Sequence, residues 1–204
     1  MRCLSCRVSP PHFARAVSYA RYDEELRELV HLLKFGRMKR LARCELGCWL
    51  AEAMLELRDE MPEGALVMAV PLHRGRRWER GFNQSELLAD AALRRLKRST
   101  PEWDLTRAHS ALKRTRATAE LYPLQPRARS KALEGAFRVR DRKMVRGRTI
   151  LLIDDVMTTG ATARECTRTL LAAGAAKVFV ATLSRAQEAV LTASWSAPES
   201  GVSA

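Results

Sequence analysis

ILLIDDVMTTGAT, residues 150–162, is the stretch that decides the fold of this chain. Four apolar residues lead directly into Asp154 and Asp155, and a short loop containing threonines and Gly160 follows. An apolar run bounded in this way predicts a fully buried strand of a parallel sheet. Ligands of open α/β sheets bind outside the carboxyl ends of the strands, which is where this loop must lie. The sequence therefore predicts an α/β fold with a binding site at the loop.

The loop carries the groups that a phosphate requires. Gly160 allows the backbone to come close, and the start of the following helix supplies free N–H groups and a positive dipole end. Asp154 and Asp155 could accept hydrogen bonds from sugar hydroxyls, so the pattern indicates a ribose 5-phosphate group. A surface turn after a core strand is the alternative interpretation. The candidate phosphate-binding residues are Thr158, Thr159, Gly160, Ala161 and Thr162.

A second stretch, residues 70–84, also ends a strand and begins a helix. Between this strand and this helix we expect a basic loop, residues 73–80. Guanidinium groups bind phosphate oxygens in a bidentate manner, so a loop beside the first one would suit a pyrophosphate group. A solvated basic turn is the alternative. The candidate residues are His73, Arg74, Arg76, Arg77 and Arg80.

Apolar periodicity predicts the remaining elements. Helices are expected over 24–35, 41–57 and 84–96, and strands over 65–72, 136–140, 148–154 and 178–183. Thr162 and Glu165 have the spacing of a capping box, so a helix is expected to begin at Thr162. Residues 1–15 are expected to form a loop, and residues 97–135 show no sustained period. The predicted organisation is an N-terminal segment (1–62), an α/β domain (63–188) and a frayed tail (189–204).

The net charge of +13 indicates either a polyanionic partner or a solubilising surface. No apolar run approaches the ~20 residues that a membrane helix needs. The N-terminus also lacks the apolar core of a secretory signal. We therefore expect a cytoplasmic protein without membrane insertion.

The chain has five cysteines, and without a secretory signal these do not favour a disulfide framework. Cys3 and Cys6 have the spacing of half a zinc site, but a structural zinc needs four ligands and no second C-x-x-C follows. Cys44 and Cys48 lie one helical turn apart and are predicted to be two buried thiols. Cys166 is predicted to lie in the core.

Residues 150–162 resemble the motif for phosphoribosyl pyrophosphate (PRPP) in type I phosphoribosyltransferases. Combined with residues 70–84, they are similar to the ComF family of phosphoribosyltransferase-like proteins, and the similarity extends over residues 1–186. That family commonly begins with a four-cysteine zinc ribbon, of which only Cys3 and Cys6 are present here. Zinc is therefore a second candidate cofactor, with Cys3 and Cys6 as half of a ligand set.

The resemblance implies roles for the candidate residues. Asp154 and Asp155 would hold the ribose 2- and 3-hydroxyls and, through the substrate, Mg²⁺, while residues 158–162 would surround the 5-phosphate. Arg80 would assist the leaving pyrophosphate together with the other residues of its loop. Arg114 and Arg116 would belong to a mobile loop over the site. The predicted catalytic residues are Asp154, Asp155 and Arg80.

Three functions follow as hypotheses. The first is a phosphoribosyltransferase that uses PRPP and Mg²⁺, acts on an unknown nucleobase and releases pyrophosphate. The second, implied by the resemblance, is a competence factor that binds single-stranded DNA or other competence proteins, for which the basic segments 107–131 and 138–148 are suited. The third is a PRPP-responsive regulator without turnover, favoured by Leu121 and Ala132, where the family pattern has Gln and Asn. Only the N-terminal helices could build a base pocket, and their sequence does not reveal one.

Overall fold

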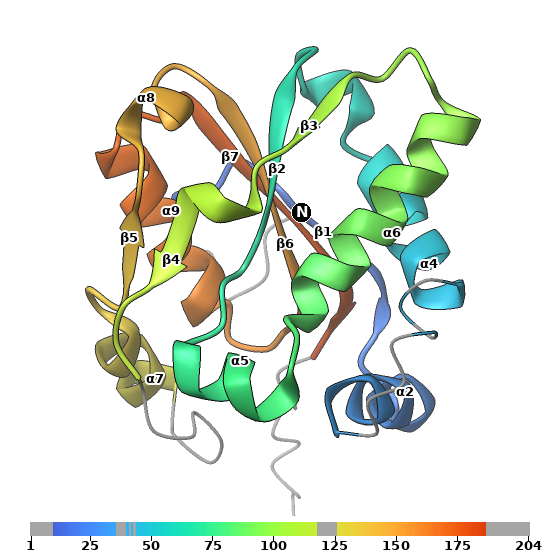
Figure 1. Ribbon diagram of the computed structural model, residues 1–204, viewed down its shortest axis with the longest axis horizontal. Helices are drawn as coiled ribbons and strands as arrows, with labels where there is room; N and C mark the ends of the chain where they lie inside the picture. The colour runs from blue at the N-terminus through green and yellow to red at the C-terminus, as the bar shows by residue number, and fades with distance from the viewer. Residues whose placement is uncertain (1–9, 36–39, 41, 43, 118–125, 187–204) are drawn as a thin grey trace, which may run out of the picture.

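A computed structural model describes residues 10–35, 40, 42, 44–117 and 126–186 (Figure 1). In this part of the chain a parallel sheet has the strand order β1-β7-β6-β2-β3. All neighbouring pairs are parallel. The strands are β1 (Ala16–Arg21), β2 (Ala65–Ala69), β3 (Leu105–Arg107), β6 (Thr149–Met157) and β7 (Lys177–Arg185). The predicted α/β class with a parallel sheet is confirmed.

Strand β6 lies at the centre of the sheet because both of its faces are apolar. Leu151 and Ile153 pack into the core on one face, whereas Ile150 and Leu152 pack into the core on the other. All four side chains are fully buried. Successive side chains of a strand point to opposite faces, so a continuous apolar run is what a strand covered on both sides requires.

Helices cover both faces of the sheet (Figure 1). One core includes residues of α2 (Glu24–Phe35), α4 (Glu45–Leu55) and α6 (Gln84–Ser99). The other includes residues of α7 (Pro126–Leu133), α8 (Arg142–Val145) and α9 (Ala161–Ala172). An antiparallel pair, β4 (Leu112–Arg114) and β5 (Phe137–Val139), belongs to the second core. The remaining elements are α5 (Arg74–Arg80) and the 3₁₀ helices η1 (Arg58–Glu60) and η2 (His109–Ala111).

Two local predictions were wrong at the carboxyl edge of the sheet. The expected basic loop is the helix α5, which His73 caps by accepting a hydrogen bond from the N–H of Gly75. Helix α9 begins at Ala161 with Gly160 as its cap, rather than at Thr162. Glu165 does not close a capping box, because its carboxylate accepts hydrogen bonds from Gly135 N at 2.7 Å and from Arg168.

Other differences concern segments for which no regular element was predicted. Residues 16–21, for which no element was predicted, form the edge strand β1 beside β7. The aperiodic segment 97–135 contains β3, η2, β4 and α7. The tail 189–204 lies outside the described residues, and the predicted division into three segments stays a prediction.

The cysteines follow the prediction only in part. Cys166 is fully buried, as expected. Cys44 is exposed and Cys48 is half-buried, so the prediction of two buried thiols was wrong. Cys44 precedes α4 instead of lying within it, so the two residues do not share a helix face toward the core. Cys3 and Cys6 lie outside the described residues.

Among the described residues, no helix has the length and apolar character needed to cross a membrane.

Candidate functional site

The carboxyl ends of the central strands bring the two predicted loops to the same edge of the sheet. Strand β6 leads into the 158–160 loop and α9, and β2 leads into α5 (Figure 1). The last turn of α2 and the helix α7 also reach this edge, at the bottom of the view. The site is therefore assembled from segments on both sides of the sheet.

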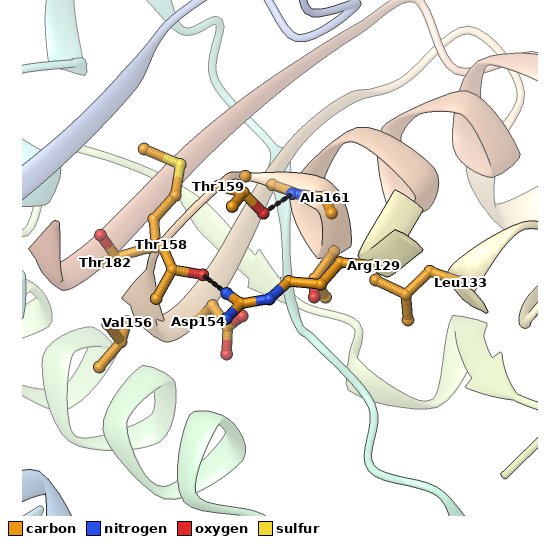
Figure 2. Close-up of a pocket in the computed structure, with 12 residues that line it drawn as sticks. Arg129, Leu133, Asp154, Val156, Thr158, Thr159, Ala161 and Thr182 are labelled. Atoms are coloured by element: carbon orange, nitrogen blue, oxygen red, sulfur yellow. Dashed lines mark hydrogen bonds between the residues drawn. The ribbon is translucent and has the colours of Figure 1, made fainter. Parts of the chain in front are cut away.

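The 158–160 loop precedes the start of α9. Gly160 has φ 73°, in the left-handed region that a residue with a side chain adopts at a cost. Thr159 Oγ1 accepts a long hydrogen bond from Ala161 N at 3.4 Å. Thr158 Oγ1 accepts one from the guanidinium of Arg129 in α7 at 3.1 Å (Figure 2). The loop thus presents hydroxyls, a helix N-terminus and a guanidinium together.

These groups line a small cavity, which Figure 2 shows. All five predicted phosphate-binding residues belong to its wall, and Asp154 belongs to it as well. Asp155 does not. The lining residues are Arg129, Leu133, Asp154, Val156, Met157, Thr158, Thr159, Gly160, Ala161, Thr162, Ala163 and Thr182.

The two acids of the motif have different partners. Asp154 Oδ1 accepts hydrogen bonds from Ser85 Oγ at 3.0 Å and from the N–H of Asp155 at 2.9 Å. Asp155 Oδ1 accepts one from the N–H of Val156 at 2.8 Å. Its other oxygen forms an ion pair with Lys34 Nζ at 2.7 Å. Lys34 belongs to α2, so this contact ties the N-terminal part of the chain to the motif.

Different surroundings separate the pKa values of the two acids. Burial, together with the neighbouring charge of Asp155, raises the pKa of Asp154 to about 7. Burial acts in the same direction on Asp155, but the ammonium of Lys34 outweighs it and holds the pKa of Asp155 below its ordinary value. The pKa of Lys34 is raised, since the attraction of Asp155 outweighs the effect of burial. Near neutral pH Asp155 is therefore ionised, and Asp154 is close to the midpoint of its titration.

The basic residues of α5 do not all face the acids. Arg77 forms an ion pair with Glu86 at 2.7 Å on the protein surface, and Arg74 is exposed. Arg80 is half-buried and donates a hydrogen bond to Gln84 Oε1 at 3.2 Å. Its guanidinium also lies 5.0 Å from the centre of the Phe35 ring.

Arg76 interacts electrostatically with Arg80 and also with Arg114, which comes from β4. Burial and then the charge of Arg76 lower the pKa of Arg114. Burial lowers the pKa of Arg80 too, with Arg76 adding to the effect and Asp155 opposing it. A set of cations that repel one another close to two carboxylates is an arrangement suited to a polyanion.

The second arginine of the expected mobile loop has a structural partner. Arg116 donates hydrogen bonds to the carbonyl oxygens of Ala132 at 3.0 Å and Glu134 at 2.8 Å. It therefore connects β4 to the end of α7. Residues 118–125 of the same expected loop lie outside the described residues.

Lys34, Ser85 and Arg129 contribute to the site although sequence reasoning did not select them. Ser85 directly follows the predicted second stretch, and its position at the start of a helix was the only available signal. Lys34 ends an amphipathic helix, where a basic residue is ordinary. Arg129 lies in a segment without periodicity. The local sequence around each of the three residues gives no sign that the residue belongs to a binding site and not to the ordinary surface.

The oxygen atoms at this edge fit Mg²⁺ better than zinc. Magnesium binds oxygen atoms and is commonly held by one or two carboxylates plus substrate phosphates. Asp154 and Asp155 could supply the carboxylates, and a bound substrate could supply the phosphates. No group of three or more His, Cys, Asp or Glu residues that could hold a metal occurs in the described part of the chain. The zinc candidates Cys3 and Cys6 lie outside that part.

Residues 83–194 match the family model described as a phosphoribosyl transferase domain. The chain is 38% identical over 186 residues to the DNA utilization protein YhgH of Escherichia coli (strain K12), covering 90% of this chain and 77% of that protein. It is 29% identical over 189 residues to Competence protein F of Haemophilus influenzae, covering 90% and 78%. The glutamine PRPP amidotransferase from B. subtilis aligns in structure with a TM-score of 0.43 and 22% identity, over 70% of this chain and 26% of that one.

The chain belongs to the phosphoribosyl transferase domain family. Its relatives place it among the ComF-like, type I members of that family, as the two motifs predicted.

Proposed function

We propose that this protein binds PRPP with Mg²⁺ at the carboxyl edge of the sheet and transfers the phosphoribosyl group to a nitrogenous base, with release of pyrophosphate. The observation that supports this most is the cavity that Asp154 shares with residues 158–162. The carboxylate of Asp154 suits the hydroxyls of a ribose, and residues 158–162 suit its 5-phosphate.

The 5-phosphate would lie at the start of α9. Free N–H groups of the first turn and the positive end of the helix dipole favour an anion there. The hydroxyls of Thr158 and Thr159 would donate to phosphate oxygens. Arg129, which already contacts Thr158, would add a charge-assisted hydrogen bond.

The ribose would lie against Asp154, which lines the cavity. Asp155 is directed to Lys34 and is only 4% exposed, so its role would be to position Asp154 and the end of α2. The 2- and 3-hydroxyls would donate to the carboxylate oxygens of Asp154. This division of labour differs from the expectation that both acids hold the ribose hydroxyls.

Displacement of pyrophosphate from ribose C1 develops positive charge on the sugar and negative charge on the leaving group. Preorganised charges that match this pattern lower the barrier. Arg76, Arg80 and Arg114 would stabilise the pyrophosphate, and the carboxylates would stabilise the sugar cation. Mg²⁺, when bound, would neutralise part of the leaving-group charge.

Calorimetric titration tests the proposal. PRPP is expected to bind in the presence of Mg²⁺ and more weakly in its absence, with ribose 5-phosphate as the reference ligand. Thr159→Ala is expected to abolish or strongly weaken binding without unfolding the protein, whereas Met144→Ala, an exposed substitution on α8, should not change it. Absence of PRPP binding by the folded wild-type protein would contradict the proposal. With binding in place, pyrophosphate release with a set of nucleobases tests turnover.

A role with single-stranded DNA is the second candidate, because the chain carries a net charge of +13 and two relatives are named for DNA utilization and competence. Binding through phosphates should weaken steeply as salt increases. A titration with an oligonucleotide at two salt concentrations separates this role from PRPP binding. PRPP binding without pyrophosphate release for any base would instead favour a regulator.

A further inference from the structure

A second cavity lies between helix α6 and the edge strand β3. Strand β3 ends the sheet, so among the described strands it has only β2 as a neighbour. The C-terminal half of α6, the turn after it and β3 enclose a groove of about 540 Å³. In Figure 1 these elements lie in the upper part of the view, whereas α5 and α7 lie at the bottom. None of the described residues lines both the groove and the phosphate cavity.

One wall of the groove is apolar. Leu93 and Leu105 line it and are half-buried, and Trp103, although only 7% exposed, lines it as well. Ligand pockets are roughly 300 to 1,000 Å³ in volume and mostly apolar, with a few polar groups that fix the ligand. The size of the groove and its apolar wall therefore suit the apolar body of a small molecule.

The contact between Asp90 and Arg107 holds the groove open at a fixed width. Arg107 in β3 donates hydrogen bonds to both carboxylate oxygens of Asp90 in α6, at 2.6 and 3.3 Å. His109 Nε2 lies 3.1 Å from Asp90 Oδ1, and His109 Nδ1 accepts a hydrogen bond from the N–H of Ala69 in β2 at 3.1 Å. The charges of Asp90 and Arg107 thus satisfy each other, and a ligand would find the groove already formed.

The other charged groups of the groove favour an anion. Arg94 and Lys97 line it, are exposed, and form no ion pair within the part of the chain that the structure describes. They are three residues apart on α6, so they share one face of the helix. Asp104 is the remaining carboxylate of the groove. Two cations beside one carboxylate suit a single negative charge better than a doubly charged phosphate ester, which Asp104 would repel more strongly.

We propose that the groove between α6 and β3 binds a small apolar carboxylate. Its apolar body packs against Leu93, Trp103 and Leu105, and its carboxylate is bound by Arg94 and Lys97. The groove is separate from the carboxyl edge of the sheet, so this site does not depend on PRPP binding. A protein that failed to bind PRPP would still be expected to bind the carboxylate.

Three ligands with one ring system and different charges test the proposal: 1-naphthylacetate, its neutral amide, and 1-naphthylmethylamine, a cation at neutral pH. Each is titrated calorimetrically against the full chain, and decanoate serves as an aliphatic acid. We expect 1-naphthylacetate to bind with a Kd of about 1 mM or tighter, the range for a ligand of its size. The amide should bind about fivefold more weakly, as the loss of an exposed ion pair implies, and the amine more weakly still.

Substitutions locate the bound acid. Arg94→Ala and Lys97→Ala should each weaken 1-naphthylacetate binding about fivefold and leave the affinity for the amide unchanged. Arg95→Ala is the matched control, because Arg95 is exposed on the same helix but does not line the groove. It should change neither affinity. Leu105→Glu introduces a carboxylate into the apolar wall and should abolish binding of the acid. If that variant does not fold, the variants of Arg94 and Lys97 decide the outcome.

Four results would overturn the proposal. The first is that neither 1-naphthylacetate nor decanoate binds. The second is equal affinity for the acid, the amide and the amine. The third is an equal loss in Arg94→Ala and Arg95→Ala, which would show a general effect of surface charge. The fourth is competition by inorganic phosphate with binding retained in folded Leu105→Glu, which would place the acid in the phosphate cavity.

Discussion

Replacement of Asp154 by Asn is expected to stabilise the protein, and more so as the pH rises. The pKa of Asp154 is raised to about 7 in the folded protein, whereas an exposed aspartate has a pKa near 3.9. Between these values the folded state binds more protons than the unfolded state. Stability of the wild-type protein therefore falls as the pH rises through this window, and the loss is complete above about pH 7.

The size of the effect follows from the shift. The pKa shift spans roughly three pH units, and each unit changes the free energy of unfolding by about 1.4 kcal/mol. Ionisation of Asp154 therefore lowers the free energy of unfolding, relative to low pH, by about 4 kcal/mol at pH 8 and by roughly 1.5 kcal/mol at pH 5. Asparagine has the same shape and no charge. Its side-chain oxygen can still accept the hydrogen bonds from Ser85 Oγ and from the N–H of Asp155. The advantage of Asp154→Asn should thus grow by about 2 to 3 kcal/mol between pH 5 and pH 8.

Urea unfolding of both proteins at pH 5 and pH 8 measures this difference. Asp155→Asn is the matched control, because it changes the neighbouring carboxylate in the same way. Its expected effect has the opposite sign: Lys34, with only 23% of its side chain exposed, would lose its partner, at a cost of about 3 kcal/mol. Both variants should bind ribose 5-phosphate less well than the wild type.

An Asp154→Asn protein that is less stable than wild type at pH 8 would refute this reasoning. An advantage that is equal at the two pH values would refute it as well, because a pH-independent gain cannot come from the ionisation of Asp154. If Asp155→Asn stabilised the protein by a similar amount, the two acids would not differ in their surroundings as described.

Two further substitutions test the phosphate-binding loop. Gly160→Ala should lower the free energy of unfolding by about 1 kcal/mol, since Gly160 has φ 73°, and should weaken ribose 5-phosphate binding in a calorimetric titration. Arg129→Ala should reduce the affinity for ribose 5-phosphate about tenfold with little change in the urea midpoint, because Arg129 donates to Thr158 at the protein surface. Wild-type affinity in Arg129→Ala would exclude a role for α7 in phosphate binding.

The sequence was sufficient to predict the centre of the fold because the deciding signals are local. The apolar run into Asp154 is continuous, and it forms the central strand whose two faces are both buried. The helix over 24–35 was predicted with the bounds that the structure shows, since its apolar residues repeat at helical spacing. The edge strand β1 was missed, because an edge strand is partly exposed and its pattern is weak.

Errors at the candidate site have a common cause. Helix α5 has no buried residue, so no apolar period marks it, and its arginines suggested a loop. The capping box at Thr162 had the correct spacing, but Gly160 in the left-handed conformation begins the helix earlier. Glu165 instead accepts hydrogen bonds from Arg168 in the same helix and from Gly135, which only the tertiary fold brings near.

Lys34 shows most directly what a local pattern cannot contain. Two adjacent carboxylates, of which Asp155 is buried and Asp154 is half-buried, repel each other and are costly to ionise together. The fold reduces this cost by giving the acids different environments: Asp155 receives an ammonium from α2, and Asp154 keeps a proton more readily and faces the cavity. The motif can therefore present one carboxylate to a ligand only when α2, distant in the sequence, is packed against the sheet. The same contact holds the last turn of α2 against strand β6, so a residue of the N-terminal segment sets the charge balance of the two acids.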